Sequence, residues 1–402
     1  MTRHVPPVSR DRGAETSPGR GGGAAAAATA VAAYAALVAA VGVVRVTGDG
    51  IVYYRFLQRL FGEHPPHPFA YQFGNALWNA PFWVVGRELG ESQAAIAVAT
   101  HAAVLVTCAL GVLLLRRLEL PGGAWLALAA VLGSPLWYYA VFAPAYSHAV
   151  DALVVTALVV AIVTRFRPAF VGTLLGAALV TRYSNAAWAP AVAALYLYRR
   201  EWRAVAEAAG AAAVTAAILF AIPVLRGIEY GNPGENDPTE PPREHLDAEL
   251  DLLAPAKMLV SEHRGLFLWT PLTLLGVVGF VLLARRLRRP ELAAVGGGAL
   301  LVLLAHVAWG RWWDGGFSYS ARFLTSLFPL YLLGLGELVR RAAVAAWLAA
   351  AACVGWSLFL GVNHHYGFEG VNRSSGVVDV ATARSPVDAL RLVGARVRDR
   401  FT

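Results

Sequence analysis

The carboxylate of Asp49 stands where the first long apolar stretch of the chain, residues 24–46, gives way to polar sequence. Gly48 and Gly50 flank it, and Tyr53 and Tyr54 follow one turn later. A carboxylate at the mouth of a membrane span can accept a proton from a hydroxyl group at the bilayer surface, which is the chemistry of a general base. Asp-Gly is also a common turn dipeptide, so a purely structural turn is the alternative interpretation.

Further charged side chains stand at the ends of other apolar runs. They are Arg55, His148, Asp151, Arg182, Arg264, Arg311, Asp314 and Arg322. Charges near a bilayer are costly unless they line a polar cavity, so these residues are candidates for a functional site. Both signs are present, as recognition of a phosphorylated substrate would require.

His148 and Asp151 lie one helical turn apart, at positions i and i+3. A polar pair that caps a helix explains them as well as a functional role does. Two such side chains do not make a zinc site, which needs three or four protein ligands. A divalent cation therefore stays an open question, with Asp49 as the candidate ligand.

Three arginines are candidates for binding a phosphate. Arg182 lies between two short apolar runs, where it is either a snorkelling anchor or a buried anion ligand. Arg322 enters an apolar run after a tryptophan-rich stretch whose glycine pair, 315–316, permits close approach to a ligand. Arg264 is the third candidate. Interfacial packing explains the tryptophans without any function.

The composition indicates a polytopic membrane protein. Of the 402 residues, 57% are hydrophobic and only 15% are charged, whereas soluble domains are about one quarter charged. The formal net charge is +8. Because the arginines cluster in short loops between apolar runs rather than along one face, we expect a lipid bilayer and no nucleic acid as the partner.

Apolar runs predict an all-α fold of about eleven transmembrane helices. They cover 24–46, 92–115, 122–142, 147–164, 168–181, 185–198, 204–224, 265–284, 291–309, 322–339 and 342–362. The segment 71–86 is shorter and carries Gln72, Asn75, Asn79 and Pro81, which favours a partly inserted or interfacial helix.

Arginine-rich segments alternate with arginine-poor ones along these runs. Arg116-Arg117, Arg165 with Arg167, Arg199-Arg200 with Arg203, Arg285 to Arg289, and Arg340-Arg341 fall at every second boundary. Since arginine accumulates in cytoplasmic loops, these segments predict the cytoplasmic side. Asp49 and the other candidate site residues then face outside the plasma membrane.

The predicted organisation has three parts. Residues 1–23 form a disordered cytoplasmic tail, and residues 24–362 form the membrane-embedded domain with outer loops at 47–91 and 226–264. The second of these loops has turn and breaker chemistry rather than a strand or helix pattern. Residues 363–402 form an extracytoplasmic C-terminal segment, in which 387–401 has apolar residues at helical spacing among arginines.

Five short segments, in this order, resemble the membrane-embedded glycosyltransferases of the type C fold (GT-C). They are 48–54, 73–82, 135–148, 262–271 and 312–324. The family includes protein O-mannosyltransferases and lipid A aminoarabinose transferases, and the later segments look like those of uncharacterised prokaryotic members. Several branches carry two adjacent acids in the first outer loop, whereas here Asp49 is followed by Gly50, so the metal requirement and the branch stay open.

The resemblance implies transfer of a sugar from a polyprenyl (dolichyl or undecaprenyl) phosphate to a hydroxyl of a glycan, lipid or protein acceptor. Asp49 would act as the base in a single, inverting displacement, while Arg182, Arg322 and Arg264 bind the donor phosphate. The remaining cavity candidates are Tyr53, Tyr54, His148, Asp151 and Asp314. A transporter or flippase of lipids or lipid-linked glycans is the alternative, because intramembrane arginines also line translocation paths, although no inverted repeat is visible.

Overall fold

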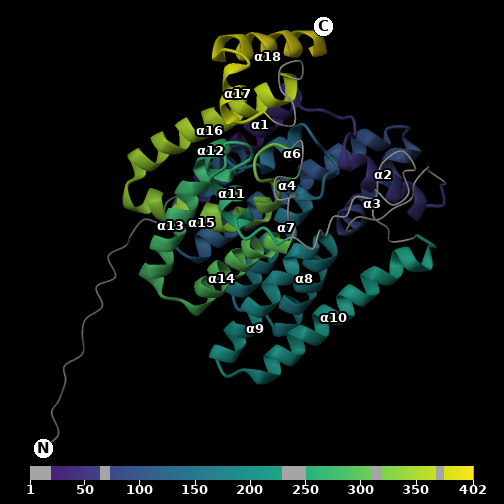
Figure 1. The fold of residues 1–402 in the computed structure, drawn as a ribbon, viewed down its shortest axis with the longest axis vertical. Helices are drawn as coiled ribbons and strands as arrows, with labels where there is room; N and C mark the ends of the chain where they lie inside the picture. Colours follow the sequence, from purple (N-terminus) through teal and green to yellow (C-terminus); the bar gives the residue numbers. More distant parts are fainter. Residues whose placement is uncertain are drawn as a thin grey trace, which may run out of the picture.

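The computed structural model describes residues 20–63, 73–228, 250–308, 315, 318–367 and 375–401. Within these ranges the protein is helical and contains no β-strand. Figure 1 shows a bundle of helices with α10 lying along one flank and α18 across one end. The long unbroken helices are α1 (Arg20–Val41), α4 (Ser92–Arg117), α7 (His148–Val163), α8 (Pro168–Thr181), α10 (Trp202–Leu225), α14 (Pro290–Ala305) and α16 (Ala343–Tyr366).

Four of the predicted apolar runs are divided into two helical pieces. They form α5 (Gly123–Leu132) with α6 (Leu136–Val141), η1 (Tyr183–Ala187) with α9 (Trp188–Tyr198), α12 (Leu266–Trp269) with α13 (Leu272–Leu287), and η3 (Arg322–Leu327) with α15 (Phe328–Arg341). Pro135 and Pro271 stand at two of these breaks. Proline disfavours helical backbone at the residue before it and has no N–H to donate, so a new helix begins there.

Six helical segments in the described part of the chain are long and apolar enough to cross a membrane: 23–41, 92–117, 202–225, 290–308, 322–341 and 343–366. Shorter apolar helices at 123–132, 148–163 and 168–181 pack among them. The prediction of a membrane protein with transmembrane helices is therefore confirmed. The number eleven stays a prediction.

Smaller helices lie outside these segments: α2 (Asp49–Leu60), α3 (Gly74–Glu88), α11 (Ala254–Val260), α17 (Val377–Thr382) and α18 (Pro386–Phe401). α3 and α18 match the helices predicted at 71–86 and 387–401. α11 corrects the prediction that the loop 226–264 has turns and no helix; its helical residues follow the breaker-rich segment 233–242. α1 begins at Arg20, and the rest of the predicted N-terminal tail lies outside the described residues.

The candidate site residues and the arginine-rich segments occupy opposite ends of the same helices. His148 begins α7 and Arg165 follows its last turn. Arg182 follows α8, whose other end is preceded by Arg167. Arg322 begins η3, and the continuous α15 ends at Arg341. The two groups of charges are therefore separated by the length of a helix.

Buried acids join the arginine-rich helix ends to one another. Glu291, at the start of α14, contacts Arg165, with 2.6 Å between Nε and Oε1, and also contacts Arg199. Its side chain is only 2% exposed. These three residues come from segments that are predicted to share the cytoplasmic side, and their contact agrees with that grouping.

The α2–α3 hairpin rests on its own apolar cluster. Phe56 of α2 stacks on Phe73, with ring centroids 5.8 Å apart, and Phe61 stacks on Trp83 at 4.9 Å. Ile96 of α4 joins the same buried cluster. The burial of these aromatic residues holds the start of α2, and with it Asp49, against the bundle.

Glycines allow α13 and α15 to pack with their backbones in contact. A Cβ atom on Gly334 would lie 1.7 Å from the carbonyl oxygen of Gly276, and one on Gly279 would lie 2.0 Å from that of Gly334. No rotamer change can relieve a clash with backbone. Close approach of small residues is a usual way for membrane helices to pack.

We expect Gly334→Ala to destabilise the protein by about 1–3 kcal/mol, since the added methyl group forces the two helices apart. The matched control is Gly297→Ala in α14, where nothing lies within 4 Å of the added Cβ. Thermal unfolding in detergent should show a lower midpoint for Gly334→Ala only. Equal midpoints for the two variants would contradict this packing.

Candidate functional site

The backbone at Asp49 is held against the loop between α6 and α7. Gly48 has a φ of +54°, and a Cβ atom there would lie 2.1 Å from the hydroxyl oxygen of Tyr146. The N–H of Asp49 donates to that same hydroxyl, at 3.1 Å. The glycine before Asp49 is therefore required both by the backbone angle and by the contact with Tyr146.

Asp49 is paired with Arg322. Nη1 of Arg322 donates to Oδ2 of Asp49 at 2.8 Å, and the two side chains are 14% and 38% exposed, respectively. The residues are 273 positions apart in the chain. A proposed proton acceptor and a proposed phosphate ligand thus face each other at a partly exposed position.

Arg322 has donor capacity beyond this pair. Its Nε is buried and has no hydrogen-bond acceptor among the described residues. Gly315, with a φ of +68°, lies against this nitrogen, and a Cβ atom at that position would approach it to 2.6 Å. Gly315 thus makes room for the Arg322 side chain, while close approach of a ligand to the glycine pair stays a prediction.

Two loops at the site contain non-glycine residues with left-handed backbone. Ala145 has a φ of +76° and Ser320 a φ of +54°. Ala145 is fixed by Asn75, whose side chain donates to its carbonyl oxygen at 2.5 Å, and by Thr100, which accepts from its N–H at 3.2 Å. Such conformations persist where the surroundings hold them, and they concentrate at functional sites.

A second group of charges lies behind the first. Nη1 of Arg182 is 3.0 Å from Nδ1 of His148, and its Nε is 3.6 Å from Oδ2 of Asp151. Asn185 donates to Oδ1 of Asp151 at 2.7 Å. Arg182 is 5% exposed, so its guanidinium is directed to a buried carboxylate and does not snorkel to the surface.

Phe323 joins the two groups. The guanidinium carbon of Arg182 is 5.0 Å from its ring centroid and that of Arg322 is 5.2 Å from it. The two cations therefore contact one ring, and each gains cation–π attraction. Tyr139 contacts the same region, with its ring 4.4 Å from that of His148 and 5.6 Å from that of Tyr146.

Tyr53 and Tyr146 complete the site as neutral polar groups. Burial raises the pKa of Tyr53 to about 12, and burial also raises the pKa of Tyr146. Both hydroxyl groups stay protonated at neutral pH, so they serve as hydrogen-bonding groups and not as bases. Tyr53 is hydrogen-bonded to Ser147, at the start of α7.

Other sequence candidates lie elsewhere. The hydroxyl of Tyr54 contacts Oγ of Ser92 at 2.6 Å, because adjacent residues of a helix point in different directions. Arg264 is fully buried, donates to the carbonyl oxygens of His263 and Ser375, and lies 5.2 Å from the Trp269 ring centroid. It does not contact Asp49 or Arg322, but its neighbour Trp269 packs on Tyr319, whose backbone is hydrogen-bonded to Tyr139 at the site.

Asp314 and Arg311 lie outside the described residues, so their relation to Asp49 stays a prediction.

The residues around Asp49 do not form a metal site in the described part of the chain. No group of three His, Cys, Asp or Glu side chains gathers there with suitable geometry. The Asp49 carboxylate is bound by Arg322 instead. Because Asp314 lies outside the described residues, the requirement for a divalent cation stays an open question.

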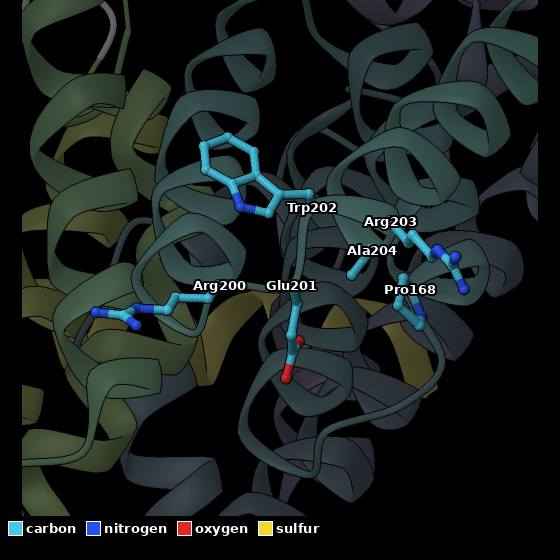
Figure 2. Close-up of a pocket in the computed structure, with 6 residues that line it drawn as sticks. All are labelled: Pro168, Arg200, Glu201, Trp202, Arg203 and Ala204. Atoms are coloured by element: carbon cyan, nitrogen blue, oxygen red, sulfur yellow. The ribbon is translucent and has the colours of Figure 1, made fainter.

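A surface pocket of about 570 Å³ lies away from this site (Figure 2). It is lined by Pro168, Arg200, Glu201, Trp202, Arg203 and Ala204. Pro168 begins α8, whereas Arg182 follows its last residue, so pocket and site are at opposite ends of that helix. Figure 2 shows Arg200 and Arg203 pointing to opposite sides of the pocket. Its charged groups do not converge as those at Asp49 do.

Sequence reasoning did not assign roles to Tyr139, Tyr146, Asn185 and Phe323. Asn185 and Phe323 each stand close to an arginine in the chain, which is a weak signal. Tyr146 is close to His148 in the same short loop. Its hydroxyl group contacts Gly48, where any side chain would clash with it. Only the folded chain shows that contact.

One of three comparisons with known proteins, the comparison with solved structures, found a similar fold. No protein-family model matches the sequence, and no curated protein matches it. The chain is similar in structure to ArnT from Cupriavidus metallidurans, which was crystallised bound to undecaprenyl phosphate. The TM-score is 0.50 at 16% identity, over 92% of this chain and 72% of that one. At this identity the likeness shows a GT-C-like membrane fold and nothing finer.

Proposed function

We propose that this protein is a membrane glycosyltransferase that takes a sugar from a polyprenyl phosphate and transfers it to an acceptor hydroxyl. The observation that carries the proposal is the Asp49–Arg322 pair, a carboxylate and a guanidinium 2.8 Å apart at the partly exposed rim of the bundle. The GT-C-like fold supports it, because ArnT binds undecaprenyl phosphate on a similar architecture.

Arg322 is the proposed ligand of the donor phosphate. A guanidinium binds phosphate through several parallel N–H donors, and Nε of Arg322 is directed at no acceptor among the described residues. Arg182 contacts the same Phe323 ring as Arg322 and adds positive potential. Arg182 already pairs with Asp151. In this proposal Arg182 therefore contributes to the positive electrostatic potential at the donor phosphate more than it binds that phosphate directly.

Donor binding would also activate the base. With no donor present, the Asp49 carboxylate is held by Arg322. A phosphate that takes over Nη1 of Arg322 leaves Asp49 as a free proton acceptor beside it. Asp49 then becomes available only when the donor is in place, which limits unproductive chemistry.

In the proposed reaction, the acceptor oxygen attacks the anomeric carbon while the bond from that carbon to the phosphate oxygen breaks. The electron pair of the broken bond goes to the phosphate, where Arg322 stabilises the developing charge. The acceptor proton goes to Asp49. A single displacement inverts the anomeric configuration, and the arginine distribution favours the extracytoplasmic face as the place of the proposed reaction.

The test is a transfer assay with purified protein in detergent. Synthetic undecaprenyl- and dolichyl-phosphate sugars are supplied with lipid, glycan and peptide acceptors, and product is detected by mass spectrometry. We expect sugar transfer that inverts the anomeric centre. A transporter would instead move the lipid-linked sugar across proteoliposome membranes without forming product, and that outcome would reject the transferase.

A further inference from the structure

Arginines concentrate at the helix ends that lie opposite the Asp49 site. Eight of them stand at the last turn of α4, at the last turn of α13 with the linker that follows it, and at the last turn of α15. We call this set the arginine platform: Arg116, Arg117, Arg285, Arg286, Arg288, Arg289, Arg340 and Arg341.

A buried carboxylate organises the platform. The side chain of Glu337 is 0% exposed and receives hydrogen bonds from Arg286, Arg340 and Arg341 at 2.8–3.2 Å. Arg286 and Arg340 each reach both of its oxygens. The three guanidinium-bearing side chains remain 31%, 37% and 43% exposed. Some N–H groups of each guanidinium donate to Glu337, while part of each side chain stays exposed at the surface.

The end of α4 joins the same surface. A Cβ atom on Gly336, next to Glu337, would touch Leu115 and Leu120, which lie on either side of Arg116 and Arg117. The helix ends of α4, α13 and α15 thus converge. Apart from Glu337, these segments carry one carboxylate, Glu119. Glu291, the next acid along the chain, is already bound by Arg165 and Arg199.

We propose that the arginine platform binds the phosphate groups of anionic phospholipids in the cytoplasmic leaflet. The positive surplus is large, it lies at the ends of membrane helices, and anionic headgroups are the negative charges present at that depth. Guanidinium groups match phosphate oxygens in geometry. Glu337 already holds three of these guanidinium groups in place before any lipid binds. This site is separate from the proposed transferase site and does not depend on it.

The test uses full-length protein in detergent, titrated with phosphatidylglycerol or phosphatidylcholine, and bound lipid is counted by native mass spectrometry. The platform variant is Arg285→Gln, Arg288→Gln and Arg289→Gln, which are exposed and leave the Glu337 contacts intact. The matched control is Arg167→Gln, Arg200→Gln and Arg203→Gln. It removes the same charge at the same end of the bundle, from segments that contribute no arginine to the platform.

Wild-type protein should retain phosphatidylglycerol over phosphatidylcholine. The platform variant should bind phosphatidylglycerol about tenfold or more weakly, and the control should change by less than about twofold. Equal losses in both variants would show a general surface-charge effect and overturn the proposal. Competition by millimolar inorganic phosphate would assign the platform to a soluble anion instead. Unfolding midpoints without lipid verify that both variants fold.

Discussion

Asp49→Asn should reduce sugar transfer by about 100- to 10,000-fold, the usual cost of losing a general base. Asparagine has nearly the same shape and can still accept a hydrogen bond from Arg322, but it cannot take the acceptor proton. Initial rates with a polyprenyl-phosphate sugar at saturating donor would measure the loss. Retention of more than about one tenth of wild-type activity would rule out the role of base.

Donor binding separates this effect from misfolding. In the proposed mechanism Asp49, which is paired with Arg322, competes with the donor phosphate, so its neutralisation should leave donor affinity unchanged or make it tighter. Loss of transfer together with retained donor binding is therefore the expected signature. Asp388→Asn, on the exposed α18, removes the same charge far from Arg322 and should leave both quantities unchanged.

Arg322→Ala should weaken binding of the donor phosphate by about 10- to 150-fold, because hydrogen bonds to a charged group contribute about 1.5–3 kcal/mol. Arg322→Lys keeps the positive charge but not the planar fork, so its loss should be smaller. Titration of folded protein with a polyprenyl phosphate measures both. Unchanged affinity in Arg322→Ala would reject Arg322 as the phosphate ligand.

Arg182→Ala should behave differently, and the contrast is the control for Arg322. Arg182 neutralises the buried Asp151, whose side chain is 1% exposed. Removal of one partner of such a buried pair costs about 3–5 kcal/mol, so the main expected effect is a lower yield of folded protein. Adding Asp151→Asn to Arg182→Ala should restore part of that yield, since no unpaired charge then remains.

Periodicity and composition were sufficient for the class of fold. The long apolar runs predicted membrane helices, and the described helices follow those runs closely, from α4 at 92–117 to α16 at 343–366. Pro135 and Pro271, both visible in the sequence, break two of the helices. The prediction missed these breaks because the hydropathy of both runs is continuous across the proline. Helix ends depend on a few residues, whereas hydropathy averages over about twenty.

The candidate site could be proposed from the sequence as a set of residues but not as an arrangement. Charge beside an apolar run is costly, so the sequence by itself selected Asp49, Arg182, Arg322, His148 and Asp151. The same rule also selected Arg264, and the resemblance added Tyr54, but the fold directs these two side chains to Trp269 and to Ser92. The free-energy cost of a charge near the bilayer identifies single residues. It does not identify the partner with which each charge is paired.

Pairing was decided by the tertiary structure. Asp49 meets Arg322 across 273 residues, and Arg182 meets Asp151, because helix packing brings distant loops to one end of the bundle. Either arginine could neutralise either acid as far as sequence is concerned. The sequence determined a membrane bundle with charges at both ends of its helices. The fold decided which charges satisfy each other, because an ion pair depends on distances of a few ångströms that only packing sets.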